Sequence, residues 1–456
     1  MKTLFKGGTV VSSNGAIVTD LLVDGEVIVA MGQNLKEAAV NMVDVTGKYL
    51  LPGFIDGHTH FDLDVCNTTT ADDYATGSQS ALRGGTTMVV DFATPNKGET
   101  LAYGLELWHK KAAGKTACDY SFHMTIDDWN DNIERELSDM VEAGITSFKM
   151  YMTYPAMMVG DCDMFRALQS LKKLGCIAGV HCENSGVIDA LVAQEKAAGN
   201  LVPSAHPKSR PSQTEAEAVS RYLRMAELAD TPVIIVHLST AEALQEVEIA
   251  RKRGQTVFVE TCPHYLFLND SAYDQPYVEA SKFICAPPLR KAKDQDALVS
   301  GLQTGAVNTV ATDHCSFNLA QKAIGQGDFT TIPGGMPGVE TRGTLLYSQL
   351  VAKGKLTLPQ MVAVLSENPA KLYGMFPQKG ILTVGSHCDM VVFDPTTAGT
   401  LTAKDLIANV EYTPFEGFET AGTIDQVYLR GQLVVDGGTV LKTTNGKFIH
   451  RGKPQI

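Results

Sequence analysis

The chain has 456 residues, of which 44% are hydrophobic and 20% are charged, and its formal net charge at pH 7 is −13. This is an ordinary globular composition with enough apolar residues for a large core. The acidic balance, without any basic stretch, argues against a nucleic acid or an anionic membrane as partner.

The N-terminal sequence Met1–Gly8 lacks the apolar core and cleavage site of a signal peptide. No apolar run reaches the length of about 18 residues that a membrane-spanning helix needs. The nine cysteines are scattered through apolar segments and do not form a small-domain framework. We therefore expect reduced thiols in a cytoplasmic protein.

The two ends of the chain share a β-rich pattern. Short apolar runs such as Thr9–Val11 and Leu21–Val23 flank a turn at Asn14-Gly15. The last eighty residues repeat this pattern at 389–394 and 426–429. Because chain ends often lie close together, we predict one small β-sandwich domain built from 1–50 and 378–456.

Residues 51–377 alternate apolar strand patterns with amphipathic helical patterns. With the stretch that ends near His58, the strand candidates are 87–92, 120–124, 147–151, 177–181, 233–237, 257–261 and 309–313. Eight strands alternating with helices predict a (β/α)₈ TIM barrel as the catalytic domain, in an α/β fold. In such barrels the active site lies at the C-terminal ends of the strands.

His58 and His60 follow the apolar pair Phe54-Ile55. Residues i and i+2 of a strand point to the same face, so both imidazoles would project side by side. Other predicted strands end in polar residues as well, and the full set is His58, His60, Lys149, His181, His237 and Asp313. Four imidazoles and a carboxylate exceed the three or four ligands of one zinc ion and predict a site for two metal ions.

Lys149 does not fit such a site as a cation, because an ammonium beside two dications is repelled. One interpretation is a lysine whose amino group reaches solvent. The other is a lysine carbamylated by carbon dioxide, which would supply a bridging carboxylate. The sequence alone leaves both interpretations open.

These residues lie in motifs that resemble a known family. The run 52–60 is similar to the opening of the cyclic amidohydrolases. Later motifs resemble the hydantoinase and dihydropyrimidinase branch, and they lie at 144–154, 181–184, 236–239, 260–263 and 311–315. The resemblance extends over the whole chain. It implies a homotetramer that hydrolyses 5-substituted hydantoins or 5,6-dihydropyrimidines to N-carbamoyl amino acids.

The resemblance also implies roles for the site residues. His58, His60 and Asp313 would hold the more buried metal ion, and His181 and His237 the more exposed one. Lys149, as N6-carboxylysine, would bridge the two divalent ions, for which zinc is expected. A hydroxide between the metals would attack the ring amide.

In the same family scheme, Tyr154 would donate its hydroxyl to the developing oxyanion, and Asp313 would carry the proton to the leaving nitrogen. Two simpler interpretations stay open: Tyr154 as a loop aromatic and Asp313 as a helix cap at a strand end. The chain departs from the branch at Ala286, where serine is usual, and at Gly334, where asparagine is usual. In the family these positions bind the ring amide largely through backbone groups, so the resemblance implies that the two changes affect ring preference more than catalysis.

Substrate choice is expected to depend on the loops after the strands. Residues 62–67 and 154–159 are candidates by position. In the second loop, Met157 and Met158 are expected to form an adaptable wall, because methionine adapts to varied shapes; the alternative is that these residues only pack the loop. Allantoinase or a dihydroorotase-like activity is the alternative within the enzyme class. A non-enzymatic dihydropyrimidinase-like scaffold protein is the alternative outside it.

Overall fold

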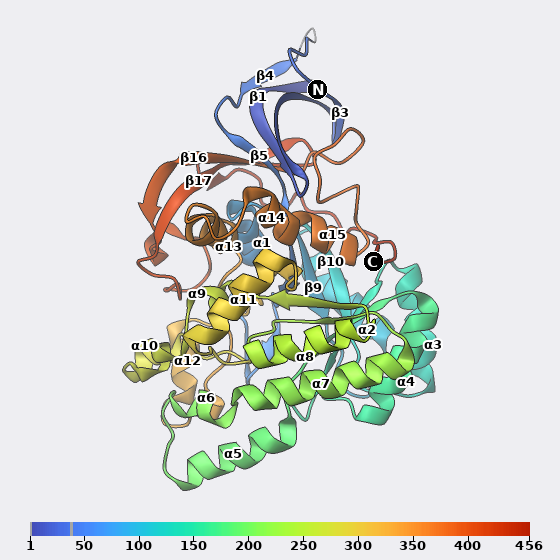
Figure 1. Cartoon of the computed structure of the whole chain (residues 1–456), viewed down its shortest axis with the longest axis vertical. Coiled ribbons are helices and arrows are strands. Elements are labelled where there is room, and N and C mark those ends of the chain that lie inside the picture. Colours follow the sequence, from blue (N-terminus) through green and yellow to red (C-terminus); the bar gives the residue numbers. More distant parts are fainter. Residues whose placement is uncertain (1, 37–39) are drawn as a thin grey trace.

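The computed structural model describes residues 2–36 and 40–456, and most of its strands belong to two large sheets (Figure 1). Eight parallel strands follow one another around a barrel in the order β15-β14-β13-β12-β11-β10-β9-β6. Their bounds are β6 (Phe54–Thr59), β9 (Thr86–Ala93), β10 (Asp119–Thr125), β11 (Ser147–Tyr151), β12 (Ile177–His181), β13 (Val233–Ile235), β14 (Val257–Thr261) and β15 (Thr309–Val310).

Helices connect these strands and cover the outside of the barrel (Figure 1). The helices up to β13 are α1 (Tyr74–Arg83), α2 (Leu101–Ala112), α3 (Asp131–Glu142), α4 (Asp161–Leu174), α5 (Ser185–Ala197), α6 (Ala205–Ser209) and α7 (Ser212–Ala229). Those after it are α8 (Ala241–Lys252), α9 (Pro263–Phe267), α10 (Tyr277–Ser281), α11 (Ala292–Thr304), α12 (Leu319–Lys322), α13 (Arg342–Leu346), α14 (Leu358–Val362) and α15 (Asn368–Leu372).

The barrel strands β9 and β10 are buried along their whole length, including polar residues such as Asp91 and His123. All eight residues of β9 are buried, for example. The surrounding helices are amphipathic: α7 buries Ala218, Tyr222 and Ala226 on one face, and α3 buries Ile133 and Leu137.

A buried arginine closes the barrel between its first and last strands. Arg342 is fully buried, and its Nη1 donates to the Ile55 carbonyl at 2.9 Å and to the Val310 carbonyl at 2.8 Å. Thr312 Oγ1 donates to the Asp56 carboxylate at 2.7 Å across the same seam. The seam therefore brings the C-terminal end of β6 beside the segment that follows β15.

The second sheet has nine strands and draws on both ends of the chain. Its strands are β1 (Lys2–Ser12), β2 (Gly15–Asp24), β3 (Val27–Gly32), β4 (Asn41–Asp44), β5 (Tyr49–Pro52), β16 (Met390–Thr400), β17 (Glu419–Leu429), β18 (Gln432–Asp436) and β19 (Thr439–Val440). The antiparallel pairing of β5 with β16 joins the N-terminal and C-terminal strands. The predicted fold class, a TIM barrel with a β domain from both termini, is confirmed; the domain limits 1–50 with 378–456, and 51–377, remain our proposal.

Three predicted strands, 147–151, 177–181 and 257–261, have the same bounds in the structure. Two others end early, because β13 stops at Ile235 and β15 at Val310. His237 and Asp313, which follow these strands, have φ angles of 39° and 50°, so the extended conformation cannot continue through them.

All nine cysteines are free thiols. Among residues 2–36 and 40–456, no helix has both the length and the apolar character to cross a membrane.

Candidate active site

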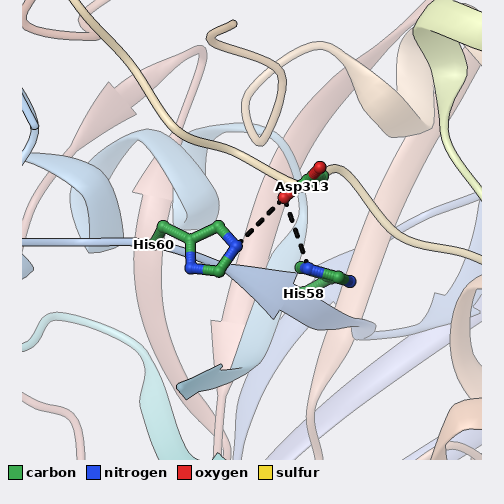
Figure 2. A group of neighbouring side chains, drawn as sticks. All are labelled: His58, His60 and Asp313. Carbon is green, nitrogen blue, oxygen red and sulfur yellow. Dashed lines mark ion pairs between the residues drawn. The ribbon is translucent and has the colours of Figure 1, made fainter. Parts of the chain in front are cut away.

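Two histidines and an aspartate meet at the barrel seam (Figure 2). His58 Nε2 and His60 Nε2 lie 3.3 Å and 3.1 Å from the same oxygen, Asp313 Oδ1. The ligand atoms of the three residues all lie within 4.8 Å of one another. The two histidines come from the end of β6 and the aspartate from the segment after β15, so closure of the barrel assembles this group.

A second group adjoins the first. His181 Nδ1 lies 3.1 Å from His237 Nε2, and Lys149 Nζ lies 3.4 Å from that same His237 nitrogen. The rings of His58 and His237 are 5.3 Å apart between centroids. The structure thus brings together all the ligand candidates predicted from the strand ends, which come from β6, β11, β12 and the ends of β13 and β15.

Burial controls the charges in both groups. It lowers the pKa of the His58, His181 and His237 imidazoles, so these rings are neutral at pH 7. Burial also lowers the pKa of Lys149 to about 8. For Asp313 burial acts in the opposite direction, but the facing imidazoles outweigh it and hold the pKa well below its usual value. Neutral imidazoles and an ionised carboxylate are the forms that bind metal ions.

Three of the predicted site residues have strained backbones. Tyr154, His237 and Asp313 have φ angles of 68°, 39° and 50°, in the left-handed region that non-glycine residues rarely adopt. Each such residue costs on the order of 1–3 kcal/mol and persists only where the surrounding structure enforces it. This concentration of strain marks the barrel mouth as a functional region.

The donor atoms fit divalent metal ions. In the first group two imidazole nitrogens face one carboxylate oxygen, and in the second two imidazole nitrogens face each other, so both groups gather donor atoms that bind metal ions. In addition, the buried Nδ1 atoms of His60 and His237 have no hydrogen-bond partner among the described residues. Nitrogen and carboxylate donors of this kind suit zinc and similar transition metals.

A cavity of about 510 Å³ opens onto both groups, and Tyr154, Ala286 and Gly334 are among the residues that line it. The Tyr154 ring centroid lies 5.2 Å from that of His181 and 5.6 Å from the Arg210 guanidinium carbon. Burial raises the pKa of Tyr154, so its hydroxyl keeps its proton and can donate. A Cβ added at Gly334 would meet only the Cys285 Cα, at 4.0 Å, so a larger side chain would fit there.

Residues 49–434 match the sequence profile of the amidohydrolase family. The chain belongs to the amidohydrolase family. The D-hydantoinase of Geobacillus stearothermophilus is 40% identical to this amidohydrolase over 457 residues, which cover 99% of this chain and 97% of the relative. The D-phenylhydantoinase of Escherichia coli strain SE11 is also 40% identical, over 100% of this chain and 99% of the relative.

Solved structures of related enzymes have the same fold over nearly the whole chain. The dihydropyrimidinase from Brevibacillus agri NCHU1002 superposes with a TM-score of 0.98 at 42% identity, over 100% of this amidohydrolase and 99% of that chain. The L-hydantoinase from Arthrobacter aurescens superposes with a TM-score of 0.89 at 29% identity, over 98% of this chain and 99% of that one.

Two buried carboxylates that the sequence did not predict orient the histidines of this amidohydrolase. Glu260 Oε1 lies 2.7 Å from His58 Nδ1, and Glu183 Oε2 lies 2.7 Å from His181 Nε2. Where the glutamate accepts the ring N–H, the contact fixes the imidazole tautomer and leaves the other ring nitrogen free to bind a metal. Glu260 lies within β14 and Glu183 lies two residues after β12, and a charged residue in or next to a buried strand was the only signal in the sequence.

Of the two methionines predicted to line the substrate cavity, only Met157 does so. Met157 lines the cavity, together with Leu63 and Val65 from the loop after β6. Met158 is 37% exposed and does not line it. The loop turns at Tyr154, whose carbonyl accepts hydrogen bonds from the backbone of both methionines, and this turn directs the neighbouring side chains to different sides.

Proposed function

We propose that this amidohydrolase opens the ring amide of 5-substituted hydantoins or 5,6-dihydropyrimidines, with N-carbamoyl amino acids as products. The observation that carries the proposal is the pair of adjoining ligand groups at the base of a cavity that also exposes the Tyr154 side chain. The names of the relatives, D-hydantoinase, D-phenylhydantoinase and dihydropyrimidinase, support the substrate class.

We infer that the site holds two divalent metal ions, with zinc as the first candidate. His58, His60 and Asp313 would bind one ion, and His181 and His237 the other. Lys149, carbamylated, would bind both. When bound, the metals would polarise the ring carbonyl and lower the pKa of water so that it can act as a nucleophile.

The chain itself would supply binding and proton transfer. Backbone groups at Ala286 and Gly334 would hold the ring amide, and the Tyr154 hydroxyl would donate to the carbonyl oxygen as negative charge develops on it. The ionised Asp313 carboxylate would accept a proton and deliver it to the ring nitrogen. The oxygen of a water molecule would bond to the ring carbonyl carbon while the ring C–N bond breaks. That carbon becomes the carboxylate, and the nitrogen receives the proton from Asp313 and leaves as part of the carbamoyl group.

A panel of substrates tests this function directly. Purified protein with measured metal content is assayed on dihydrouracil, hydantoin, phenylhydantoin, allantoin and dihydroorotate. We expect the first three to be hydrolysed at least tenfold faster than the last two. Preference for allantoin or dihydroorotate would identify the alternative enzyme class, and metal-loaded protein inactive on all five would favour the scaffold alternative.

Specificity for the ring substituent is expected to depend on Met157. Met157→Ala removes an apolar contact in the cavity and should change the rate ratio of phenylhydantoin to dihydrouracil at least fivefold, or about 1 kcal/mol. Metal content should stay the same. The matched control is Met158→Ala, whose side chain lies outside the cavity. Equal ratios in the wild type and both variants would locate the specificity pocket elsewhere.

We also propose a cytoplasmic homotetramer. The free cysteines support a reducing compartment, and the tetramer rests on the family resemblance. Light scattering at micromolar concentration should return about four times the mass of one chain, which is 49.0 kDa. A mass near that of one chain would contradict the tetramer.

A further inference from the structure

A buried lysine lies behind the cavity wall and outside the metal-ligand groups. Lys322, the last residue of α12, is 1% exposed. Its Nζ donates to the carbonyls of Ile284 at 3.3 Å, Pro333 at 2.8 Å and Gly335 at 2.8 Å. Among residues 2–36 and 40–456, its hydrogen-bond partners are these carbonyls, and no carboxylate forms an ion pair with it.

The three carbonyls match the three N–H donors of an ammonium group. An unpaired buried charge is costly, so it persists only where hydrogen bonds compensate it well. Burial lowers the pKa of Lys322 to about 8, which leaves the ammonium form predominant at pH 7. The lysine is therefore held as a cation by three backbone carbonyls, with the Phe317 ring centroid 5.6 Å from its Nζ.

The accepting carbonyls belong to the two loops that carry the proposed ring-binding positions. Ile284 lies two residues before Ala286, and Pro333 and Gly335 flank Gly334. The Gly335 N–H also donates to the Ile284 carbonyl at 2.8 Å. Lys322 thus joins the loops at their backbones, and it does not itself line the cavity.

The segment around the lysine is anchored on both sides. Gln321 Nε2 donates to Thr68 Oγ1 at 2.9 Å, which ties α12 to the hairpin of β7 (Asp64–Val65) and β8 (Thr68–Thr69). Gly325 packs so tightly against Ile332 that an added Cβ would lie 2.3 Å from the Ile332 nitrogen. Lys322 therefore has a fixed base from which to hold the loops.

We propose that Lys322 is a positioning residue that clamps the two loops, so that the backbone at Ala286 and Gly334 keeps the geometry that binds the ring amide. The proposal rests on the proposed function. Because Lys322 contacts neither the reacting atoms nor the metal ligands, its loss should weaken substrate and transition state equally. Such a change raises KM and leaves kcat nearly unaltered.

The test compares Lys322→Met with the wild-type enzyme on dihydrouracil. We expect KM to rise at least tenfold, with kcat within threefold and metal content unchanged. Backbone amides in peptides covering 283–288 and 332–337 should exchange hydrogen at least tenfold faster, while those of β10 and β11 should not change. Lys322→Gln keeps two N–H donors and should give an intermediate KM. This variant replaces Lys322→Met in the test if the methionine variant does not fold.

The matched control is Lys379→Met. Lys379 is also buried, but its Nζ donates to the carboxylates of Asp119, at 2.7 Å, and Asp389, at 2.6 Å. Asp119 is the first residue of β10. Its loss should reduce stability without changing KM. If a folded Lys322 variant has the same KM as the wild type, and its two loops exchange hydrogen at the wild-type rate, the proposed clamp is wrong. Loop exchange is measured without any reaction, so it tests the clamp even if the wild-type enzyme hydrolyses none of the proposed substrates.

Discussion

Replacing Lys149 with alanine is expected to abolish hydrolysis and remove most of the bound metal. Lys149 is 1% exposed, so the interpretation in which its amino group reaches solvent is wrong. Its Nζ lies 3.4 Å from His237 Nε2 and within 5.3 Å of the Phe92 ring centroid, in a space that would not hold an ammonium beside two dications. Carbamylation would convert this amine into the bridging anion that the site otherwise lacks.

The modification forms an N–C bond between the neutral amine and carbon dioxide and releases one proton. Because burial lowers the pKa of Lys149 to about 8, a larger share of the amine is neutral near pH 7 than for an exposed lysine. Intact-protein mass spectrometry under native conditions should detect one added CO₂ per chain. Lys149→Arg keeps a positive charge but cannot form this carbamate, so it should fail as completely as Lys149→Ala.

Activity within tenfold of wild type in either Lys149 variant would refute the carbamylated bridge. Metal analysis separates two causes of inactivity. Loss of metal with loss of activity supports a bridging ligand, whereas an inactive variant with full metal content would assign Lys149 another role.

Tyr154→Phe should lower turnover about 10²–10³-fold, the typical effect of removing one oxyanion donor. The substitution deletes only the hydroxyl, and it keeps the ring that contacts His181 and Arg210. The strained φ of 68° is the same for both residues, so folding should be little affected. Metal content should therefore stay at the wild-type value while kcat falls.

Tyr151→Phe is the matched control, because Tyr151 also lines the cavity and its ring lies 6.0 Å from that of His181. We expect this variant to keep wild-type turnover. Unchanged turnover in Tyr154→Phe would mean that Tyr154 only packs the loop and that the oxyanion depends on metal alone. An equal decrease in both variants would point to general disturbance of the cavity.

The sequence by itself determined the fold class and indicated the candidate ligand residues, because both depend on local pattern. Apolar strands alternating with amphipathic helices specify the barrel, and strands 147–151, 177–181 and 257–261 could be bounded correctly from their apolar runs. The i, i+2 spacing of His58 and His60 fixes their shared face within one strand. Topology then directs the strand-end residues to a common mouth.

The tertiary structure alone decided features that depend on pairs distant in the chain. The contact between His58 and Glu260 spans 202 residues, and the Arg342 bond to Ile55 spans 287. Such contacts leave no periodic signal, because a hydrogen bond constrains position in space and not spacing along the chain. The same holds for the left-handed turns at His237 and Asp313 and for the three carbonyls around Lys322, which exist only once loops from different strands meet.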